Sequence, residues 1–120
     1  MKIYIAHPYT GDEERNHEHA LQVEETLRKA TLNAEFINPV GRMTEQLKGL
    51  SYIEAMDRCL AELASCDGIV ICKGWKNSTG CRIEVKMARQ MQMPRWYGVD
   101  AYMRNWTQVA SKETALKAMA

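Results

Sequence analysis

The sequence predicts an α/β domain with helices on both faces of a parallel sheet, a flavodoxin-like three-layer α/β/α arrangement. Three observations support this prediction. Short apolar runs lie at 2–6, 34–37 and 68–72, amphipathic segments lie between them, and the connections are short. Strands and helices that alternate in this way are typical of right-handed βαβ crossovers. The 120 residues are close to the commonest domain size, so we expect residues 1–120 to form a single domain.

The first part of the chain supplies two strands and a long helix. Lys2–Ala6 is apolar without period-two alternation, as expected of a strand covered on both faces. Residues 12–30 read as an amphipathic helix, with acidic residues in its first turn. The apolar stripe of this helix consists of Ala20, Val23, Leu27 and Ala30. Ala34–Ile37 is the second strand, and Asn38-Pro39 stops it. Residues 38–50 then form a connection with room for one short helix.

A capping-box pattern at Ser51–Glu54 opens the next helix, which is expected to run to about Ser65. Its predicted buried stripe consists of Tyr52, Met56, Cys59, Leu60 and Leu63. Asp67 separates this helix from the third strand, Gly68–Cys72.

The last third of the chain supplies a helix, a strand and a second helix. Ile83, Met87 and Met91 recur every four residues and are expected to be core, and Pro94 marks the end of their helix. Arg95–Val99 is expected to be a fourth strand. Ser111–Met119 reads as a C-terminal helix with Ser111 as its cap.

Composition and charge exclude several classes of protein. A formal net charge of +1 argues against a surface for polymeric DNA or RNA, which is usually strongly basic. It leaves room for a small anionic ligand, which needs only one or two local positive groups. No segment approaches membrane-spanning length, and the apolar start is too short for a signal peptide. We therefore expect a cytoplasmic protein with no membrane partner.

Neither the cysteines nor the histidines predict a metal or a cofactor. The four cysteines form no CxxC pair and no zinc-ligand spacing, so buried thiols in a reducing cytosol are expected. His17 and His19 lie two apart on a helix and point in different directions, which favours solvated positions over metal ligation. No GxGxxG follows the first strand, and no GxxxxGK[ST] occurs.

The most informative segment is the loop from Lys73 to Gly80 and the helix that follows it. A buried strand ends, a small polar loop begins, and Glu84 lies about one turn inside the next helix. In an open α/β sheet this loop lies at the carboxyl ends of the strands, where ligands bind. Ser78 and Gly80 would form an anion seat at the helix start. The alternative is a simple N-cap, Ser78 or Thr79, followed by a solvated Glu84.

Three loops are expected to converge at this edge of the sheet: His7–Gly11, Asn38–Arg42 and Lys73–Gly80. His7 and Tyr9 are the candidates for ligand contacts in the first of them. Tyr4 lies within the first strand, where a core tyrosine with a partnered hydroxyl is the ordinary interpretation.

Tyr4, Asp67, Ser78-x-Gly80 and Glu84 together form a pattern that resembles the nucleoside 2-deoxyribosyltransferase superfamily. That superfamily includes the 2'-deoxynucleoside 5'-phosphate N-hydrolases. The segments KIYIAHPYTG and CDGIVICKGWKNSTGCRIE are more similar still to the small DUF4406 proteins of bacteria and phages. The resemblance covers roughly residues 1–98.

This resemblance implies a flavodoxin-like homo-oligomer whose sites are partly completed by a neighbouring subunit. Glu84 would be the carboxylate nucleophile that attacks C1' of deoxyribose, with Tyr4 beside it, so that the base leaves and a glycosyl-enzyme ester forms. Ser78 and Gly80 would hold the 5'-phosphate, which favours a nucleotide over a nucleoside. We add the hypothesis that Arg82 or Arg15 contributes positive charge there.

One position departs from the family pattern. The family usually carries an Asp eight residues before the Asp that precedes the third strand, and here Cys59 stands at that position. Asp57 is near, but two residues on a helix turn by about 200°. A general acid for the departing base is therefore missing from its usual place. Two classes of function stay open: an enzyme that cleaves or transfers at the N-glycosidic bond, and a catalytically inactive protein that senses or sequesters a nucleotide.

Overall fold

The computed structural model describes residues 1–42 and 49–105. Its elements follow the expected order closely. They are β1 (Lys2–Ala6), α1 (Glu13–Ala30), β2 (Glu35–Ile37), α2 (Tyr52–Ala64), β3 (Gly68–Ile71), the 3₁₀ turn η1 (Trp75–Asn77), α3 (Thr79–Gln90) and β4 (Arg95–Tyr97). Residues 99–105 are also helical. The helix expected at Ser111–Met119 lies outside the described residues, as does part of the 38–50 connection. None of the helices within the described ranges is long and apolar enough to cross a membrane.

The sheet is parallel throughout and has the strand order β2-β1-β3-β4. Tyr4 of β1 pairs with Ile37 of β2 on one side and with Ile69 of β3 on the other. This order is the one found at the start of flavodoxin-like sheets. The predicted three-layer α/β/α fold is therefore confirmed.

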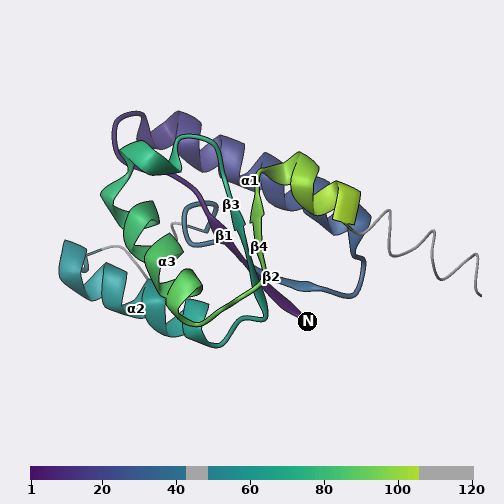
Figure 1. The fold of residues 1–120 in the computed structure, drawn as a ribbon. Coiled ribbons are helices and arrows are strands. Elements are labelled where there is room, and N and C mark those ends of the chain that lie inside the picture. Colours follow the sequence, from purple (N-terminus) through teal and green to yellow (C-terminus); the bar gives the residue numbers. More distant parts are fainter. Residues whose placement is uncertain (43–48, 106–120) are drawn as a thin grey trace, which may run out of the picture.

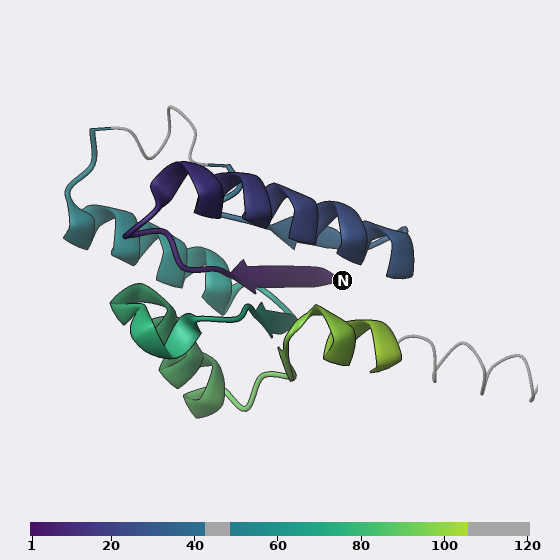
Figure 2. The same ribbon diagram turned by 90° about the horizontal axis from the view of Figure 1, so that it is seen from above.

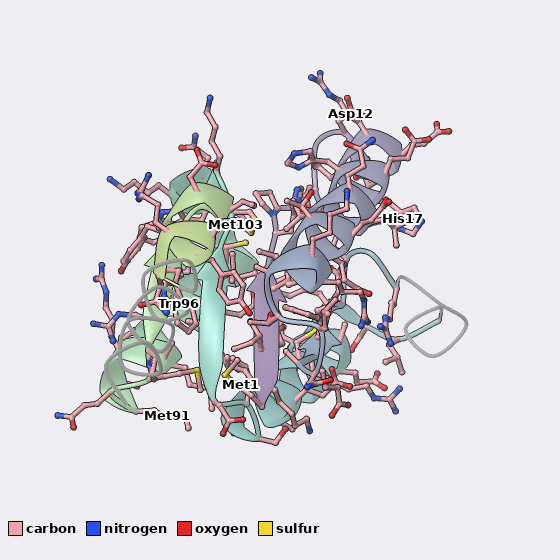
Figure 3. All side chains as sticks on the ribbon, turned by 90° about the vertical axis from the view of Figure 1, so that its right-hand side faces the viewer. Met1, Asp12, His17, Met91, Trp96 and Met103 are labelled. Atoms are coloured by element: carbon pink, nitrogen blue, oxygen red, sulfur yellow. The ribbon has the colours of Figure 1, made fainter. Side chains whose placement is uncertain are left out.

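The two faces of β1 bury different side chains because successive residues of a strand point in opposite directions. Ile3 and Ile5 pack toward α1, whereas Tyr4 and Ala6 pack toward α2 and α3. Figure 1 shows the sheet between these two helical layers, and α2 and α3 lie side by side in Figures 1 and 2. Figure 3 looks from the α1 side, where Trp96 and Met103 complete the layer with the helix at 99–105.

Two serine caps set where α2 and α3 begin. The Ser51 hydroxyl accepts a hydrogen bond from the Glu54 amide at 3.1 Å, and the Ser78 hydroxyl accepts one from the Cys81 amide at 3.2 Å. Each cap satisfies one amide that the first turn leaves without a helical partner. Both predicted helix starts are confirmed.

The predicted apolar stripe of α3 is wrong at two of its three residues, whereas Met87 is half-buried and packs against the core. Ile83 and Met91 are 39% and 44% exposed. The buried face consists of Cys81, Glu84, Val85 and Ala88. The prediction counted only strongly apolar side chains. It therefore missed the buried face of α3, which contains small residues and a carboxyl group.

The stripe predicted for α2 is wrong at its first residue. Tyr52 is 59% exposed, and Leu63 is the residue of α2 that is fully buried. Cys59 and Leu60 are half-buried and pack against the core between α2, α3 and the sheet. The first turn of α2 therefore extends past the edge of the sheet.

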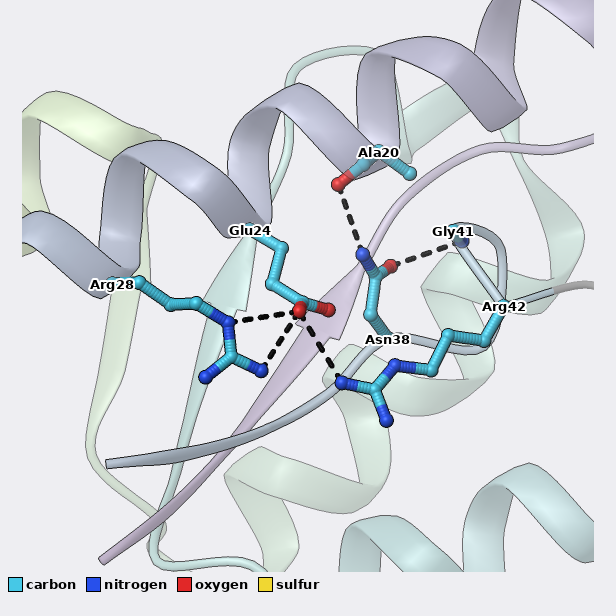
Figure 4. Close-up of polar contacts among 6 residues, drawn as sticks. All are labelled: Ala20, Glu24, Arg28, Asn38, Gly41 and Arg42. Carbon is cyan, nitrogen blue, oxygen red and sulfur yellow. Dashed lines mark hydrogen bonds and ion pairs between the residues drawn. The ribbon is translucent and has the colours of Figure 1, made fainter. Parts of the chain in front are cut away.

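The loop after β2 is fastened to α1 by a polar network (Figure 4). Asn38 donates to the Ala20 carbonyl at 2.9 Å and accepts from the Gly41 amide at 3.1 Å. A Cβ atom at Gly41 would lie 2.3 Å from Nδ2 of Asn38, so glycine is required there. Arg28 and Arg42 both contact the Glu24 carboxylate, at 2.8 and 3.2 Å. The network fixes where the chain leaves β2 at the carboxyl edge of the sheet.

Candidate functional site

A buried carboxyl–phenol pair lies between the sheet and α3. Glu84 is 7% exposed and Tyr4 is fully buried. The Tyr4 hydroxyl donates a hydrogen bond to Oε2 of Glu84. Strand alternation turns Tyr4 toward this side of the sheet, and the spacing of Cys81, Glu84 and Ala88 turns Glu84 inward. The alternative of a solvated Glu84 is therefore wrong.

Burial dominates the electrostatics of the pair. It raises the pKa of the Glu84 carboxyl from an ordinary 4.5 to about 7, and the Tyr4 hydrogen bond partly opposes that shift. The pKa of Tyr4 is raised well above 10, first by burial and then by the nearby Glu84. Tyr4 therefore stays protonated and acts as a donor. Glu84 changes charge near neutral pH.

Cys59 of α2 is the third member of this group. Its side chain packs against the core cluster that contains Tyr4, and burial raises the pKa of the thiol to about 11. Asp57, two residues away, is exposed. The side chain at position 59 thus faces the Tyr4–Glu84 pair, as the resemblance implied, but it is an uncharged thiol.

Ser78 and Gly80 lie at the start of α3, about one turn before Glu84. The Ser78 hydroxyl caps the helix, as its alternative interpretation required. Gly80 faces α2: a Cβ atom there would lie 3.4 Å from Sδ of Met56 and 3.9 Å from the Tyr52 hydroxyl. The sequence did not predict that Tyr52 and Met56 lie beside Gly80, because both were assigned to a buried stripe of α2.

Arg82 lies on the exposed side of α3, where its guanidinium is 3.5 Å from the Thr79 hydroxyl. The first turn of α3 contains no acidic residue. The start of the helix therefore keeps its positive character, with a cation one turn away.

His7 lies on the other face of the sheet from Tyr4. Its Nδ1 donates to the Pro8 carbonyl at 2.7 Å, and its Nε2 is 2.7 Å from Nδ1 of His19 on α1. Burial lowers the pKa of His7, so the ring is neutral at neutral pH. The structure does not bring this candidate together with Glu84. His19 is exposed, as expected of a solvated helix position, but no sequence signal pointed to its contact with a residue twelve positions earlier.

The first and third loops nevertheless meet. A Cβ atom at Gly74 would lie 3.5 Å from Cγ of Pro8, and Gly74 adopts a positive φ of 91°. The Tyr9 carbonyl accepts from Nδ2 of Asn16, which ties the first loop to α1. The two loops therefore share one edge of the sheet. Across the described residues, no group of three or more potential metal ligands lies together.

The fold and the site define a small α/β protein with an enclosed, ionisable carboxyl group beneath the carboxyl edge of a parallel sheet. Residues 1–97 match the family described as a domain of unknown function, DUF4406, and the chain belongs to that family. No match to a curated protein was found. The resemblance to DUF4406 is thus confirmed, and the wider link to the nucleoside 2-deoxyribosyltransferase superfamily stays a prediction.

Proposed function

We propose that the protein cleaves or transfers at the N-glycosidic bond of a deoxynucleoside 5'-monophosphate or a related nucleotide, with Glu84 as the nucleophile. One observation carries the proposal: a carboxyl group is enclosed beside a tyrosine hydroxyl at the ligand-binding edge of the sheet. Enclosed carboxyl groups with shifted pKa values are enriched at catalytic sites. The sequence pattern that the chain shares with nucleoside 2-deoxyribosyltransferases supports the same assignment.

The reaction has two steps. In the first, a carboxylate oxygen of Glu84 bonds to C1' of the sugar, the bond from C1' to the base nitrogen breaks, and the electron pair leaves with the base. In the second, water or another nucleobase attacks C1' and releases Glu84. Water gives hydrolysis, its proton ending on the released base, and a base gives transfer. Two inversions at C1' give net retention.

Tyr4 would orient the carboxylate and leave one oxygen for the sugar. Its hydroxyl occupies Oε2, and among the described residues no hydrogen bond to Oε1 is recorded. Glu84 must be ionised to attack, and burial raises its pKa to about 7. The rate should therefore rise with pH through neutrality.

The start of α3 is the proposed seat for the 5'-phosphate. Gly80 would bind the phosphate through a backbone amide of the first helical turn, and Ser78 through its hydroxyl, because the Ser78 amide already donates to the Trp75 carbonyl at 3.1 Å. Arg82 adds a charge one turn away. Tyr9 lies on the first loop, and its proposed contact with the ligand would come from that side, whereas His7 lies on the other face of the sheet. We further propose that the protein is a cytoplasmic homo-oligomer and that it needs no cofactor.

A second function is favoured by Cys59. A thiol with a pKa of about 11 is a poor proton donor to a departing base, and loss of general-acid help typically costs about 10²–10⁴-fold in rate. The protein would then bind the nucleotide without cleaving it.

One assay separates these functions. Purified protein is incubated with a panel of deoxynucleoside 5'-monophosphates, with and without a second free base, and chromatography detects released or exchanged base. Glu84→Gln should abolish release while keeping binding measured by calorimetry. Glu25→Gln, at an exposed glutamate of α1, is the matched control. Binding without release by the wild type would support the second function, and neither binding nor release would reject both.

A further inference from the structure

Positive charge is concentrated in one part of this chain. Residues 68–99 contain six of the 16 lysines and arginines but only one of the 15 acidic residues. That acidic residue is Glu84, which is buried. The six cations are all exposed: Lys73, Lys76, Arg82, Lys86, Arg89 and Arg95. The remainder of the chain is net negative, so the overall charge of +1, which argued against polymeric nucleic acid, conceals a basic region around α3.

Three of these cations form a stripe along α3. Arg82, Lys86 and Arg89 follow the i, i+4, i+7 spacing, which places them within about 60° of one another around the helix axis. The guanidinium of Arg89 donates to the Tyr97 hydroxyl at 3.0 and 3.3 Å, so the stripe lies on the flank of α3 that is next to β4. No ion pair joins any of the three cations to a carboxylate within residues 1–42 and 49–105. Their charge is therefore available to a partner.

Two aromatic rings lie beside this stripe. Tyr97 of β4 is 47% exposed, and its ring centroid is 5.9 Å from that of Trp75, which is half-buried at the start of η1. The ammonium group of Lys76 lies 5.9 Å from the centroid of the Trp75 ring. Rings and cations thus form one continuous surface, the basic–aromatic face, which consists of Trp75, Lys76, Arg82, Lys86, Arg89 and Tyr97.

We propose that the basic–aromatic face binds single-stranded nucleic acid. Cations one helical turn apart would each contact a phosphate of the strand, and the exposed rings offer surfaces on which unpaired bases stack. A duplex encloses the faces of its bases, so the rings would have no role in binding it. An acidic peptide would use the cations alone. The combination of rings and cations therefore favours an unpaired strand over other polyanions.

The test measures the fluorescence anisotropy of labelled oligo(dT) and oligo(rU), each of about 12 nucleotides, over a series of salt concentrations. The two strands distinguish DNA from RNA. Together, Lys86→Gln and Arg89→Gln should weaken binding at least ~10-fold at low salt and flatten the slope of log K against log salt by about 1.4, because two phosphate contacts are lost. Lys29→Gln with Arg104→Gln is the matched control. It removes two exposed cations from α1 and the helix at 99–105, and it should keep most of the affinity.

Tyr97 tests the contribution of the rings. Tyr97→Leu should weaken binding about fivefold or more without changing the salt slope, because stacking on an aromatic ring is lost and no charge is removed. Tyr97→Phe should bind like the wild type. Both variants lose the hydroxyl that Arg89 contacts, so they differ from each other only in the ring.

Equal losses in the two double variants, or no binding of either strand at low salt, would overturn the proposal. Duplex DNA or polyglutamate bound as tightly as the single strands would overturn it too, because the rings would then select nothing. The inference goes beyond the proposed reaction and does not depend on it. Glu84→Gln should bind both strands like the wild type, so the basic–aromatic face can be established even if the protein cleaves no glycosidic bond.

Discussion

At the scale of the residue, Glu84 makes the fold less stable as pH rises. Below pH 4.5 the carboxyl is protonated in both the folded and the unfolded chain. Between pH 4.5 and about 7 the folded chain holds a proton that the unfolded chain has released, so the free energy of unfolding falls with rising pH. Above that range the whole difference is present, at most roughly 3 kcal/mol for a shift of this size.

Glu84→Gln should therefore be more stable than the wild type at pH 8 and equal to it near pH 4, because the amide never carries a charge. Urea unfolding at a series of pH values measures the difference. A gain in stability combined with lost activity is the signature of a residue kept for function. A glutamine variant that is less stable at pH 8 would mean that the ionised carboxylate has a strong partner and is structural.

The sequence located Glu84 but not its surroundings. Its place one turn after a polar loop could be read from the chain, and so could the presence of Cys59 at the position where the superfamily that the chain resembles usually carries an Asp. Its burial could not, because a glutamate on an amphipathic helix is usually solvated. The contact with Tyr4 joins residues 80 positions apart in the sequence. Only the packing of α3 against β1 brings them together.

At the scale of the element, fold stability and phosphate binding are expected to favour different residues at position 80, near the start of α3. Gly80 has no positive φ, and a Cβ atom there would meet only ordinary contacts. Gly80→Ala should therefore keep or raise stability, by up to about 1 kcal/mol. If a phosphate approaches the backbone here, the added methyl group should weaken it at least ~10-fold, equivalent to about 1.4 kcal/mol.

The probe for this prediction is 2-deoxyribose 5-phosphate, measured by calorimetry against 2-deoxyribose. Gly80→Ala should weaken the phosphorylated sugar selectively, whereas Thr79→Ala, at an exposed neighbour, should have little effect. Undiminished affinity of the Gly80 variant for the phosphorylated sugar would place the phosphate elsewhere.

Strands and helix starts were the elements that the sequence predicted well. Unbroken apolar runs identify strands that are buried on both faces, and Ser51 and Ser78 are cap residues with a direct physical role. Helix faces were predicted poorly in α2 and α3. Ile83 and Tyr52 are exposed although they are apolar, because the position of the sheet, rather than the count of apolar residues, decides which face is covered.

At the scale of the whole molecule, the sheet divides the interior into two cores. Tyr4, Glu84 and Cys59 belong to the side of α2 and α3, whereas His7 and His19 belong to the side of α1. The strand–helix alternation was enough to predict the layers. The alternation could not show toward which face of the sheet a loop residue such as His7 would point. The direction of that side chain depends on whether the backbone stays extended beyond the end of β1.

The covalent state of Glu84 during turnover tests the central claim most directly. The wild type is mixed with a deoxynucleotide that it cleaves, quenched in acid within the first turnover, and digested for mass spectrometry. The account predicts a 2-deoxyribosyl 5-phosphate ester on the peptide that carries Glu84, and no such ester in Glu84→Gln. Release of base at an equal rate by the glutamine variant, or an adduct on another residue, would contradict it.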